Sequence, residues 1–229
     1  MKRSRGALVV LAKAPRAGEV KTRLCPPLTP EEAAELYARL LSDVLAASAE
    51  LALDLGLVAI VAVHPPQACG EIARGAPSGF SVIPQRGADL GRRMEWAVRE
   101  ACAAGAPRVV LRGSDSPLID AGVVAAALAA LDVADLVLRP DRDGGYSLVG
   151  SKRPAPGLFE HPMSTATVLD DTLANAARLC LRTRVLEPGF DIDTFADLRR
   201  LESLRSPRLT RLCPATLAYL DEHEFWRRA

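Results

Sequence analysis

Short, continuously apolar segments alternate along this chain with longer segments of helical periodicity, and this alternation restricts the fold more than any other feature. Apolar segments of strand length occupy residues 7–12, 57–63, 80–84, 108–111 and 135–138, and further strands are expected at 146–149 and 182–185. Helices are expected at residues 30–55, 67–74, 89–105, 120–131 and 165–179. Strands that are apolar along their whole length are buried on both faces. The pattern therefore predicts a three-layer α/β fold, with a mostly parallel, Rossmann-like sheet between helices.

The length of the chain favours one domain. Its 229 residues are enough for one well-buried core and few for two. Residues 194–228 are expected to be mostly helical and are rich in arginine. We interpret them as a C-terminal helical extension, about residues 196–229, of a single domain that spans residues 1–229.

Charge and cysteine content exclude several classes of protein. A formal net charge of +1 gives no field that would attract nucleic acid or an anionic membrane. The apolar runs are too short to cross a bilayer, and the N-terminus has no apolar core of a signal peptide. Five scattered cysteines indicate neither a disulfide framework nor a zinc site, so we expect reduced thiols and a cytoplasmic protein.

The loop after the first strand carries the clearest sign of a ligand. It holds four cations, Lys13, Arg16, Lys21 and Arg23, against a single acid. In open α/β sheets, ligands bind where the strands end at their carboxyl edge, and lysine and arginine at that edge suit a polyphosphate. The spacing is not that of a P-loop. The alternative is a solvated basic surface loop, but the position directly after a buried strand favours phosphate binding.

The turn after the fourth strand offers a carboxylate at the same edge. Gly113 allows close backbone approach, Pro117 restricts the turn, and Asp115 lies between them. Such a carboxylate suits Mg²⁺, which takes one or two protein carboxylates together with phosphate oxygens and water. The alternative, equally weighted on this motif alone, is that Asp115 or Asp120 caps the following helix.

Two further acidic segments follow predicted strands. Residues 141–146 contain Asp-Gly-Gly, for which a hairpin turn is the leading alternative to a binding role. Asp191 and Asp193 lie two residues apart, so both side chains share one face if the segment is extended, and that geometry suits a metal. The alternative is that Asp193 or Thr194 caps the next helix.

Taken in order, six motifs resemble the domain-of-unknown-function 2064 family, also called selenodomain-associated transferase 1. They occupy residues 12–15 with 21–24, 85–94, 113–117, 143–146, 164–169 and 191–198, so the resemblance covers roughly residues 7–201. It implies a glycosyltransferase-A type fold of the nucleotide-diphospho-sugar transferases, related to phospholactate guanylyltransferase and molybdenum-cofactor guanylyltransferase. One departure is Met163, where the family often has Trp before Ser-Thr.

Roles for individual residues come from this resemblance alone. It implies that phosphates are held by Lys13, Lys21 and Arg23, with Gly113 and Ser114 beside them, and that the base and ribose are held by Gln85, Gly87 and Gly91. It implies that Asp115 and Asp193 bind the metal, and that Lys21, Arg23 and Asp115 are catalytic. It implies that the acceptor meets Asp143, Gly144, Gly145, Tyr146, Ser164 and Thr165.

Together these features favour metal-dependent nucleotidyl transfer from a nucleoside triphosphate to a small phosphorylated acceptor, with release of pyrophosphate. Positioning and charge neutralisation dominate this chemistry, and Mg²⁺, or Mn²⁺ in its place, supplies part of both. The alternatives are a glycosyltransferase that uses a nucleotide sugar, as the family is generally labelled, and a non-catalytic nucleotide-binding protein. The charge of the first loop and the single carboxylate at residues 113–117 favour the first function. The expected partners are a nucleotide and a small acceptor, and either a monomer or a homodimer fits the sequence.

Overall fold

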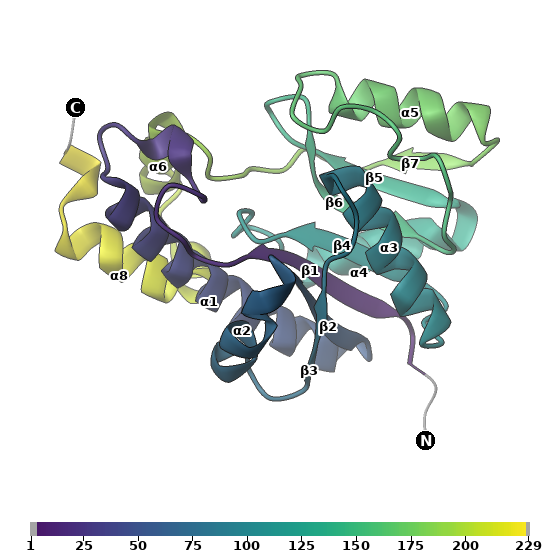
Figure 1. Cartoon of the computed structure of the whole chain (residues 1–229), viewed down its shortest axis with the longest axis horizontal. Helices are drawn as coiled ribbons and strands as arrows, with labels where there is room; N and C mark the ends of the chain where they lie inside the picture. Colours follow the sequence, from purple (N-terminus) through teal and green to yellow (C-terminus); the bar gives the residue numbers. More distant parts are fainter. Residues whose placement is uncertain (1–3, 228–229) are drawn as a thin grey trace.

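The computed structural model describes residues 4–227 and forms a seven-stranded sheet covered by helices on both faces (Figure 1). The strands are β1 (Ala7–Lys13), β2 (Val58–His64), β3 (Phe80–Pro84), β4 (Val109–Gly113), β5 (Leu136–Pro140), β6 (Tyr146–Ser151) and β7 (Thr183–Val185). Their order across the sheet is β3-β2-β1-β4-β6-β5-β7. β6 runs antiparallel to its neighbours β4 and β5, and all other neighbouring strands are parallel. The predicted α/β class and mostly parallel sheet are confirmed.

The helices cover the two faces of the sheet in turn. They are α1 (Pro30–Leu55), α2 (Cys69–Gly75), α3 (Leu90–Ala103), α4 (Ala121–Val133), α5 (Val168–Arg178), α6 (Phe195–Ser203), α7 (Pro207–Leu212) and α8 (Pro214–Glu222), with short 3-10 turns η1 (Thr22–Leu24), η2 (Pro66–Ala68) and η3 (Phe225–Arg227). Side chains alternate along β1, so Leu8 and Val10 pack toward α4 and α1, whereas Val9 packs toward α3. Within residues 4–227, no helix combines the length and the apolar character needed to cross a membrane.

Local signals fix the ends of the best-predicted helix. α1 begins and ends as expected, at Pro30 and Leu55. Thr29 accepts a hydrogen bond from the backbone N–H of Glu32, whose carboxylate accepts the N–H of Thr29 in return, and this reciprocal pair is a capping box. Gly56, with φ of 66°, ends the helix in the left-handed conformation that glycine adopts without strain.

Two other boundaries differ from the prediction. The helix expected from residue 165 begins at Val168, and Leu169 N–H, in its first turn, donates to Gly144 O at 2.9 Å. The segment expected as one short helix at residues 67–74 is a 3-10 turn followed by α2. Elsewhere the strands and helices agree with the prediction to within two residues.

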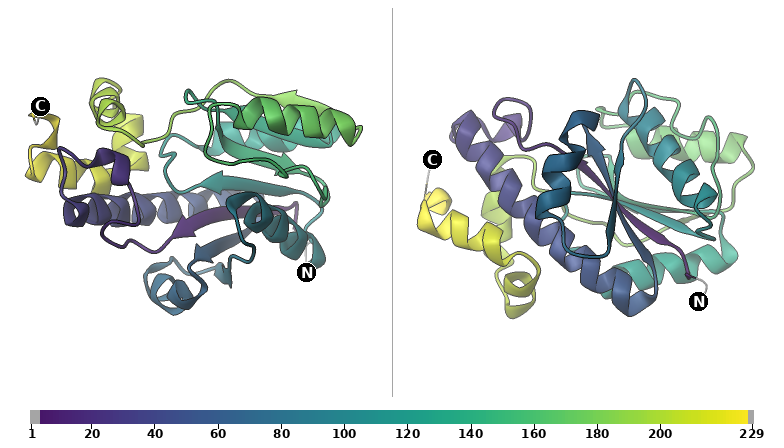
Figure 2. Two further views of the ribbon diagram at one scale, coloured as in Figure 1. Left: turned by 45° about the horizontal axis from the view of Figure 1, so that its top comes forward. Right: turned by 60° about the horizontal axis from the view of Figure 1, so that its bottom comes forward.

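The C-terminal segment packs along the longest helix. As predicted, it is mostly helical and forms α6, α7, α8 and η3, while residue 228 of the predicted segment lies outside the described residues. Asp43, on α1 and buried, accepts hydrogen bonds from Ala215 N–H, Thr216 N–H and the Thr216 hydroxyl at the start of α8. Both views of Figure 2 show α8 lying beside α1. The carboxyl ends of the parallel strands are left open for a ligand.

Candidate active site

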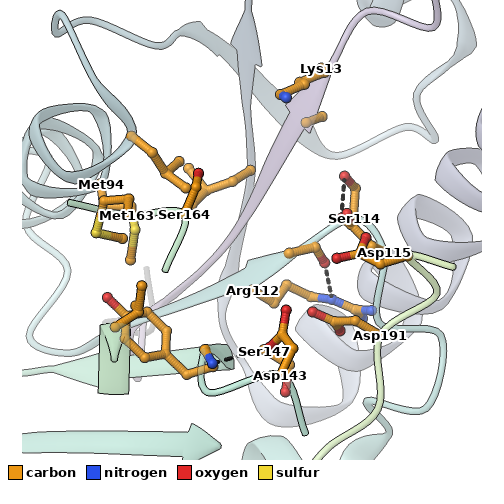
Figure 3. A pocket seen from close by; sticks show the side chains of 18 of the residues that line it. Lys13, Met94, Arg112, Ser114, Asp115, Asp143, Ser147, Met163, Ser164 and Asp191 are labelled. Carbon is orange, nitrogen blue, oxygen red and sulfur yellow. Dashed lines mark hydrogen bonds between the residues drawn. The ribbon is translucent and has the colours of Figure 1, made fainter. Parts of the chain in front are cut away.

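A cavity of about 1020 Å³ opens at the carboxyl ends of β1 and β4 (Figure 3). Segments far apart in the sequence line it. Most of the residues singled out from the sequence are among them: Lys13, Lys21, Arg23, Gln85, Gly113, Ser114, Asp115, Asp143, Gly145, Tyr146, Ser164, Thr165 and Asp193. Three are absent from the lining, namely Gly87, Gly91 and Gly144.

Lys21 lies at the centre of the charged part of this cavity. Its Nζ is 2.7 Å from Asp115 Oδ2 and 2.9 Å from Asp193 Oδ1, and its side chain is 4% exposed. Burial alone lowers the pKa of a lysine, but the charges of the two aspartates outweigh it and raise the pKa of Lys21. The residue has a φ of 50°, in the left-handed region. The two carboxylates predicted to share a metal therefore converge, and the cation at their meeting point is the ammonium of Lys21.

The backbone explains why these two aspartates meet. Ile192 N–H donates to the carbonyl of Asp115 at 3.0 Å, which brings the segment before α6 against the turn after β4. Neither aspartate caps a helix. Asp120 caps α4 by accepting the N–H of Val123, and Thr194 is the N-cap residue of α6. The capping roles considered for the two acidic segments therefore belong to Asp120 and Thr194. The side chains of Asp115 and Asp193 line the cavity instead.

A chain of hydrogen bonds ties the ends of β1 and β4 together. Lys13 N–H donates to Tyr37 Oη at 2.9 Å, and Tyr37 Oη lies 2.8 Å from Ser114 Oγ. Ser114 Oγ in turn donates to Asp115 Oδ1 at 3.3 Å. Burial raises the pKa of Tyr37 to about 12, so the phenol stays protonated and able to donate. Tyr37, which the sequence reasoning did not select, therefore orients the turn that carries Asp115.

Two further cations face the cavity with few partners. Lys13 is exposed, and its ammonium has no hydrogen-bond partner within the described part of the chain. Arg93, on α3, donates through Nε to the Asp89 carbonyl at 3.0 Å, and the structure gives no other partner for its guanidinium among residues 4–227. Lys13 pairs with His64 across β1 and β2, and burial, followed by the charges of Arg93 and Lys13, lowers the pKa of His64. We call Lys13 and Arg93 the cationic wall.

Arg23 differs from Lys21 although both follow the same strand. Its side chain is 62% exposed, and its Nη1 reaches Asp193 Oδ2 only at 3.5 Å. A contact this long and exposed contributes little stability. The guanidinium of Arg23 is therefore able to turn toward a ligand, whereas the ammonium of Lys21 is held.

The residues expected around a base and ribose make hydrogen bonds or close packing contacts within the fold. Gln85 lines the cavity, but its amide is buried and donates to the carbonyls of Ala12 at 3.0 Å and Ala62 at 2.8 Å, at the ends of β1 and β2. A Cβ at Gly91 would lie 2.3 Å from the carbonyl oxygen of Phe159, so only glycine lets α3 approach this closely. Gly87 is similarly packed, against Arg92.

The opposite side of the cavity is a hairpin and the loop that covers it. Asp143 Oδ1 accepts the N–H of Gly145 at 3.1 Å within the turn between β5 and β6, so this segment is a hairpin turn, and the turn also lines the cavity. Gly144 has a φ of 88°, and a Cβ there would lie 2.0 Å from the Ala166 carbonyl oxygen. This contact brings the loop that carries Ser164 against the hairpin, although Gly144 itself lies behind the lining.

This side contains few charges. Met94 and Met163 pack in one apolar cluster with Tyr146, and Figure 3 shows both methionines on the side of the cavity away from Asp115. Within residues 143–147 and 163–166, the one acidic residue that lines the cavity is Asp143. We call residues 143–147 and 163–166 the hairpin wall.

Asp191 is half-buried and lines the cavity together with Asp115 and Asp193. The Ser116 hydroxyl donates to it, and burial, followed by the hydrogen bond and charge of Asp141, raises its pKa well above the usual value. Two neighbouring carboxyls of this kind hold a proton between them more readily than they ionise together. The sequence indicated Asp191 and Asp193 as a pair whose spacing suits a metal. The alternation of side chains along an extended segment does not reveal the contacts of Asp191 with Ser116 and Asp141.

The comparisons with known proteins agree with this architecture. A family model described as an uncharacterized protein conserved in bacteria, DUF2064, matches residues 46–165. Phosphoenolpyruvate guanylyltransferase of Chloroflexus aggregans is 30% identical over 192 residues, covering 82% of this chain and 93% of that protein. The enzyme of the same name from Sphaerobacter thermophilus is 31% identical over 189 residues, covering 81% of this chain and 88% of that protein. A crystal structure from Desulfovibrio desulfuricans G20, provisionally described as a nucleotide-diphospho-sugar transferase, superimposes with a TM-score of 0.85 at 30% identity, covering 98% of this chain and 97% of that one.

Proposed function

The chain belongs to the DUF2064 family, and from this premise we propose that it is a nucleotidyltransferase. It would join the nucleotidyl group of a nucleoside triphosphate to a small phosphorylated acceptor and release pyrophosphate. The observation that carries the proposal is the convergence of Asp115 and Asp193 on one point beside a strongly basic loop. Relatives that match most of the chain and are named guanylyltransferases support the same reaction.

The carboxylate pair fits a divalent cation such as Mg²⁺, with Mn²⁺ as the alternative. Oxygens of Asp115 and Asp193 already lie within 3 Å of one shared cationic atom, the Nζ of Lys21. Among residues 4–227 no three His, Cys, Asp or Glu side chains form a metal-binding group. Mg²⁺ suits such a sparse site, because it commonly takes one or two carboxylates and completes its shell with phosphate oxygens and water. When bound, it would neutralise charge that develops on the phosphates.

The chain's own side chains would position the reactants. Lys13, Arg93 and Arg23 would hold the triphosphate. All three line the cavity, and none is held in a close ion pair within the described residues. The hairpin wall would hold the acceptor so that its oxygen lies in line with the α-phosphorus. A bond then forms between that oxygen and the α-phosphorus, while the bond between the α-phosphorus and the bridging oxygen to the β-phosphate breaks and pyrophosphate leaves with the electron pair. Positioning and charge neutralisation account for most of the rate in such reactions.

The names of the relatives suggest the first substrates to test, GTP and phosphoenolpyruvate. Purified protein with Mg²⁺ should release pyrophosphate from a nucleoside triphosphate only when an acceptor is present, and mass spectrometry should find the nucleotide joined to it. The test extends to the other nucleoside triphosphates and to further phosphorylated acceptors. Binding of a triphosphate without turnover by any acceptor would favour a non-catalytic nucleotide-binding protein.

A nucleotide-sugar glycosyltransferase is the second candidate, supported by the description of the similar crystal structure. Calorimetry separates it from the first. A nucleotidyltransferase should bind a triphosphate more tightly than the diphosphate of the same base, because the terminal phosphate meets additional cations. Equal affinities for the two, together with turnover of a nucleotide sugar, would replace the first proposal by the second.

A further inference from the structure

We propose that Lys21 is a resident counter-cation that makes binding of a divalent cation at Asp115 and Asp193 depend on the nucleotide. The inference builds on the metal-binding part of the proposed function, but not on the reaction itself. It assigns to Lys21 a position between the carboxylates, where the family resemblance had implied a phosphate contact and a catalytic role.

The geometry places the ammonium in the way of a free metal ion. Nζ contacts one oxygen of each carboxylate, Asp115 Oδ2 and Asp193 Oδ1, at hydrogen-bond distance. The other two oxygens have weaker contacts, 3.3 Å from Ser114 Oγ to Asp115 Oδ1 and 3.5 Å from Arg23 Nη1 to Asp193 Oδ2. A metal ion bound to the pair would therefore lie within a few ångströms of a fixed positive charge.

The ammonium is held firmly where it is. The Lys21 side chain is 4% exposed, whereas those of Asp115 and Asp193 are 36% and 34% exposed. Lys21 thus lies beneath the pair, and the carboxylates face the cavity above it. With Lys21 the three groups sum to one negative charge, and without it to two. Cation affinity rises with the charge of the ligand set, so Lys21 weakens the site for a metal ion that arrives alone.

A nucleotide changes this balance. Its polyphosphate brings several negative charges into the cavity, which offset the repulsion from the ammonium and supply the remaining metal ligands. The same phosphates offer Lys21 a further anionic neighbour. The site would then take up its metal ion together with the nucleotide, and seldom before it.

The test measures binding of Mn²⁺ alone, by electron paramagnetic resonance and calorimetry, to wild type and to Lys21→Gln. Glutamine keeps a donor for the carboxylates and removes the charge. Without nucleotide, the variant should bind Mn²⁺ about 10- to 100-fold more tightly than wild type. Adding a non-hydrolysable nucleoside triphosphate should reduce the difference in Mn²⁺ affinity between Lys21→Gln and wild type. Equal or weaker Mn²⁺ binding by a folded Lys21→Gln protein would overturn the proposal.

Matched variants exclude simpler explanations. Lys13→Gln removes the same charge from the same cavity, but Lys13 contacts neither carboxylate, so its gain in Mn²⁺ affinity should be much smaller. Lys21→Arg keeps the charge and should remain a weak binder. Asp193→Asn, added to Lys21→Gln, should abolish the gain.

Folding is followed by circular dichroism. If Lys21→Gln unfolds, recovery of the fold by millimolar Mg²⁺ supports the proposal, because the metal then replaces the missing counter-cation, and failure to recover counts against it. Because Mn²⁺ binding is read without acceptor or turnover, a failed search for nucleotidyl transfer would leave this result standing.

Discussion

The two sides of the cavity differ in charge and in the strands that form them. The side formed by the ends of β1 and β4 is crowded with charge, and its central lysine is paired to two aspartates within 3 Å. The hairpin wall opposite has one lining acid, four hydroxyl side chains and Met163, which packs in an apolar cluster with Tyr146. The charged side depends on parallel strands in the middle of the sheet, and the hairpin wall depends on antiparallel β6 and the loop that follows it. The comparison suggests that phosphate chemistry belongs to the first side and acceptor choice to the second.

The strongest way to break this comparison is Asp115→Asn, which keeps the shape of the side chain and removes its charge. If the charged side performs the chemistry, turnover should fall by about 10³-fold with little loss of stability. Pyrophosphate release under saturating substrates measures the effect. Asp120→Asn is the matched control, since Asp120 caps α4 and asparagine caps a helix almost as well. Near-normal turnover by Asp115→Asn would show that the charge of Asp115 is not needed for the reaction.

The cationic wall is tested by Arg93→Ala. A charge-assisted hydrogen bond contributes about 1.5–3 kcal/mol, so a triphosphate should bind about 10- to 100-fold more weakly, and the monophosphate of the same base should lose much less. Arg92→Ala is the control, because this neighbouring arginine pairs with Glu160 and Glu95 and does not line the cavity. Calorimetry with Mg²⁺ present compares the two. Equal losses of affinity for the triphosphate and the monophosphate would show that Arg93 does not contact the terminal phosphates.

Gly144→Ala tests the hairpin wall separately. The new Cβ would collide with the Ala166 carbonyl, so the loop carrying Ser164 should shift and stability should fall by about 1–3 kcal/mol. Gly157→Ala is the control, because Gly157 also has positive φ but its nearest atom to a new Cβ is 3.7 Å away. Denaturant unfolding gives the stability, and kinetics should show a raised KM for the acceptor with nucleotide affinity unchanged. If Gly144→Ala changed only the affinity for the nucleotide, the hairpin wall would be assigned to nucleotide binding and not to acceptor binding.

The smallest expected effect is a titration of His64. Its pKa is lowered by burial and by the charges of Arg93 and Lys13, so phosphates that neutralise these cations should raise it. Bound protein then takes up protons relative to free protein, and nucleotide affinity should rise as the pH falls between the free and bound pKa values. Proton NMR follows the ring with and without nucleotide. The resonances of His223, packed against Tyr219 and Phe225, should not respond. An unchanged His64 titration would show that the phosphates lie elsewhere.

Much of the fold could be read from the sequence because its signals are local. The Thr29 capping box and Gly56 set both ends of α1 within a few residues of chain. The hairpin signal at residues 141–146 indicated an antiparallel pairing of β6 with β5, but the pairing of β6 with β4 could not be read, because a short apolar strand carries no mark of its other neighbour. The expectation that Asp115 and Asp193 meet followed from their places after strands, and the structure brings them together.

What the sequence could not reveal is how individual side chains are used. Lys21 and Arg23 look alike in a basic loop, yet one is buried between carboxylates and the other is largely exposed. Arg93 lies within a motif noted in advance, but only its position on α3 shows that it faces the cavity. Gly91 looked like a ligand contact and is explained by the carbonyl of Phe159 beside it. Each of these depends on contacts between residues distant in sequence.

The direction of β6 has a consequence for how proteins of this type diversify. Because β6 begins at the ligand edge and ends at Ser151, opposite the starts of β4 and β5, the chain must travel back to the cavity through residues 152–167. That return path crosses the surface and forms no strand of the sheet. Insertions, deletions and new side chains there leave the central parallel strands intact. Under the proposed function, exchanging residues 152–167 between relatives would change the acceptor preference and leave the side formed by β1 and β4 unaltered.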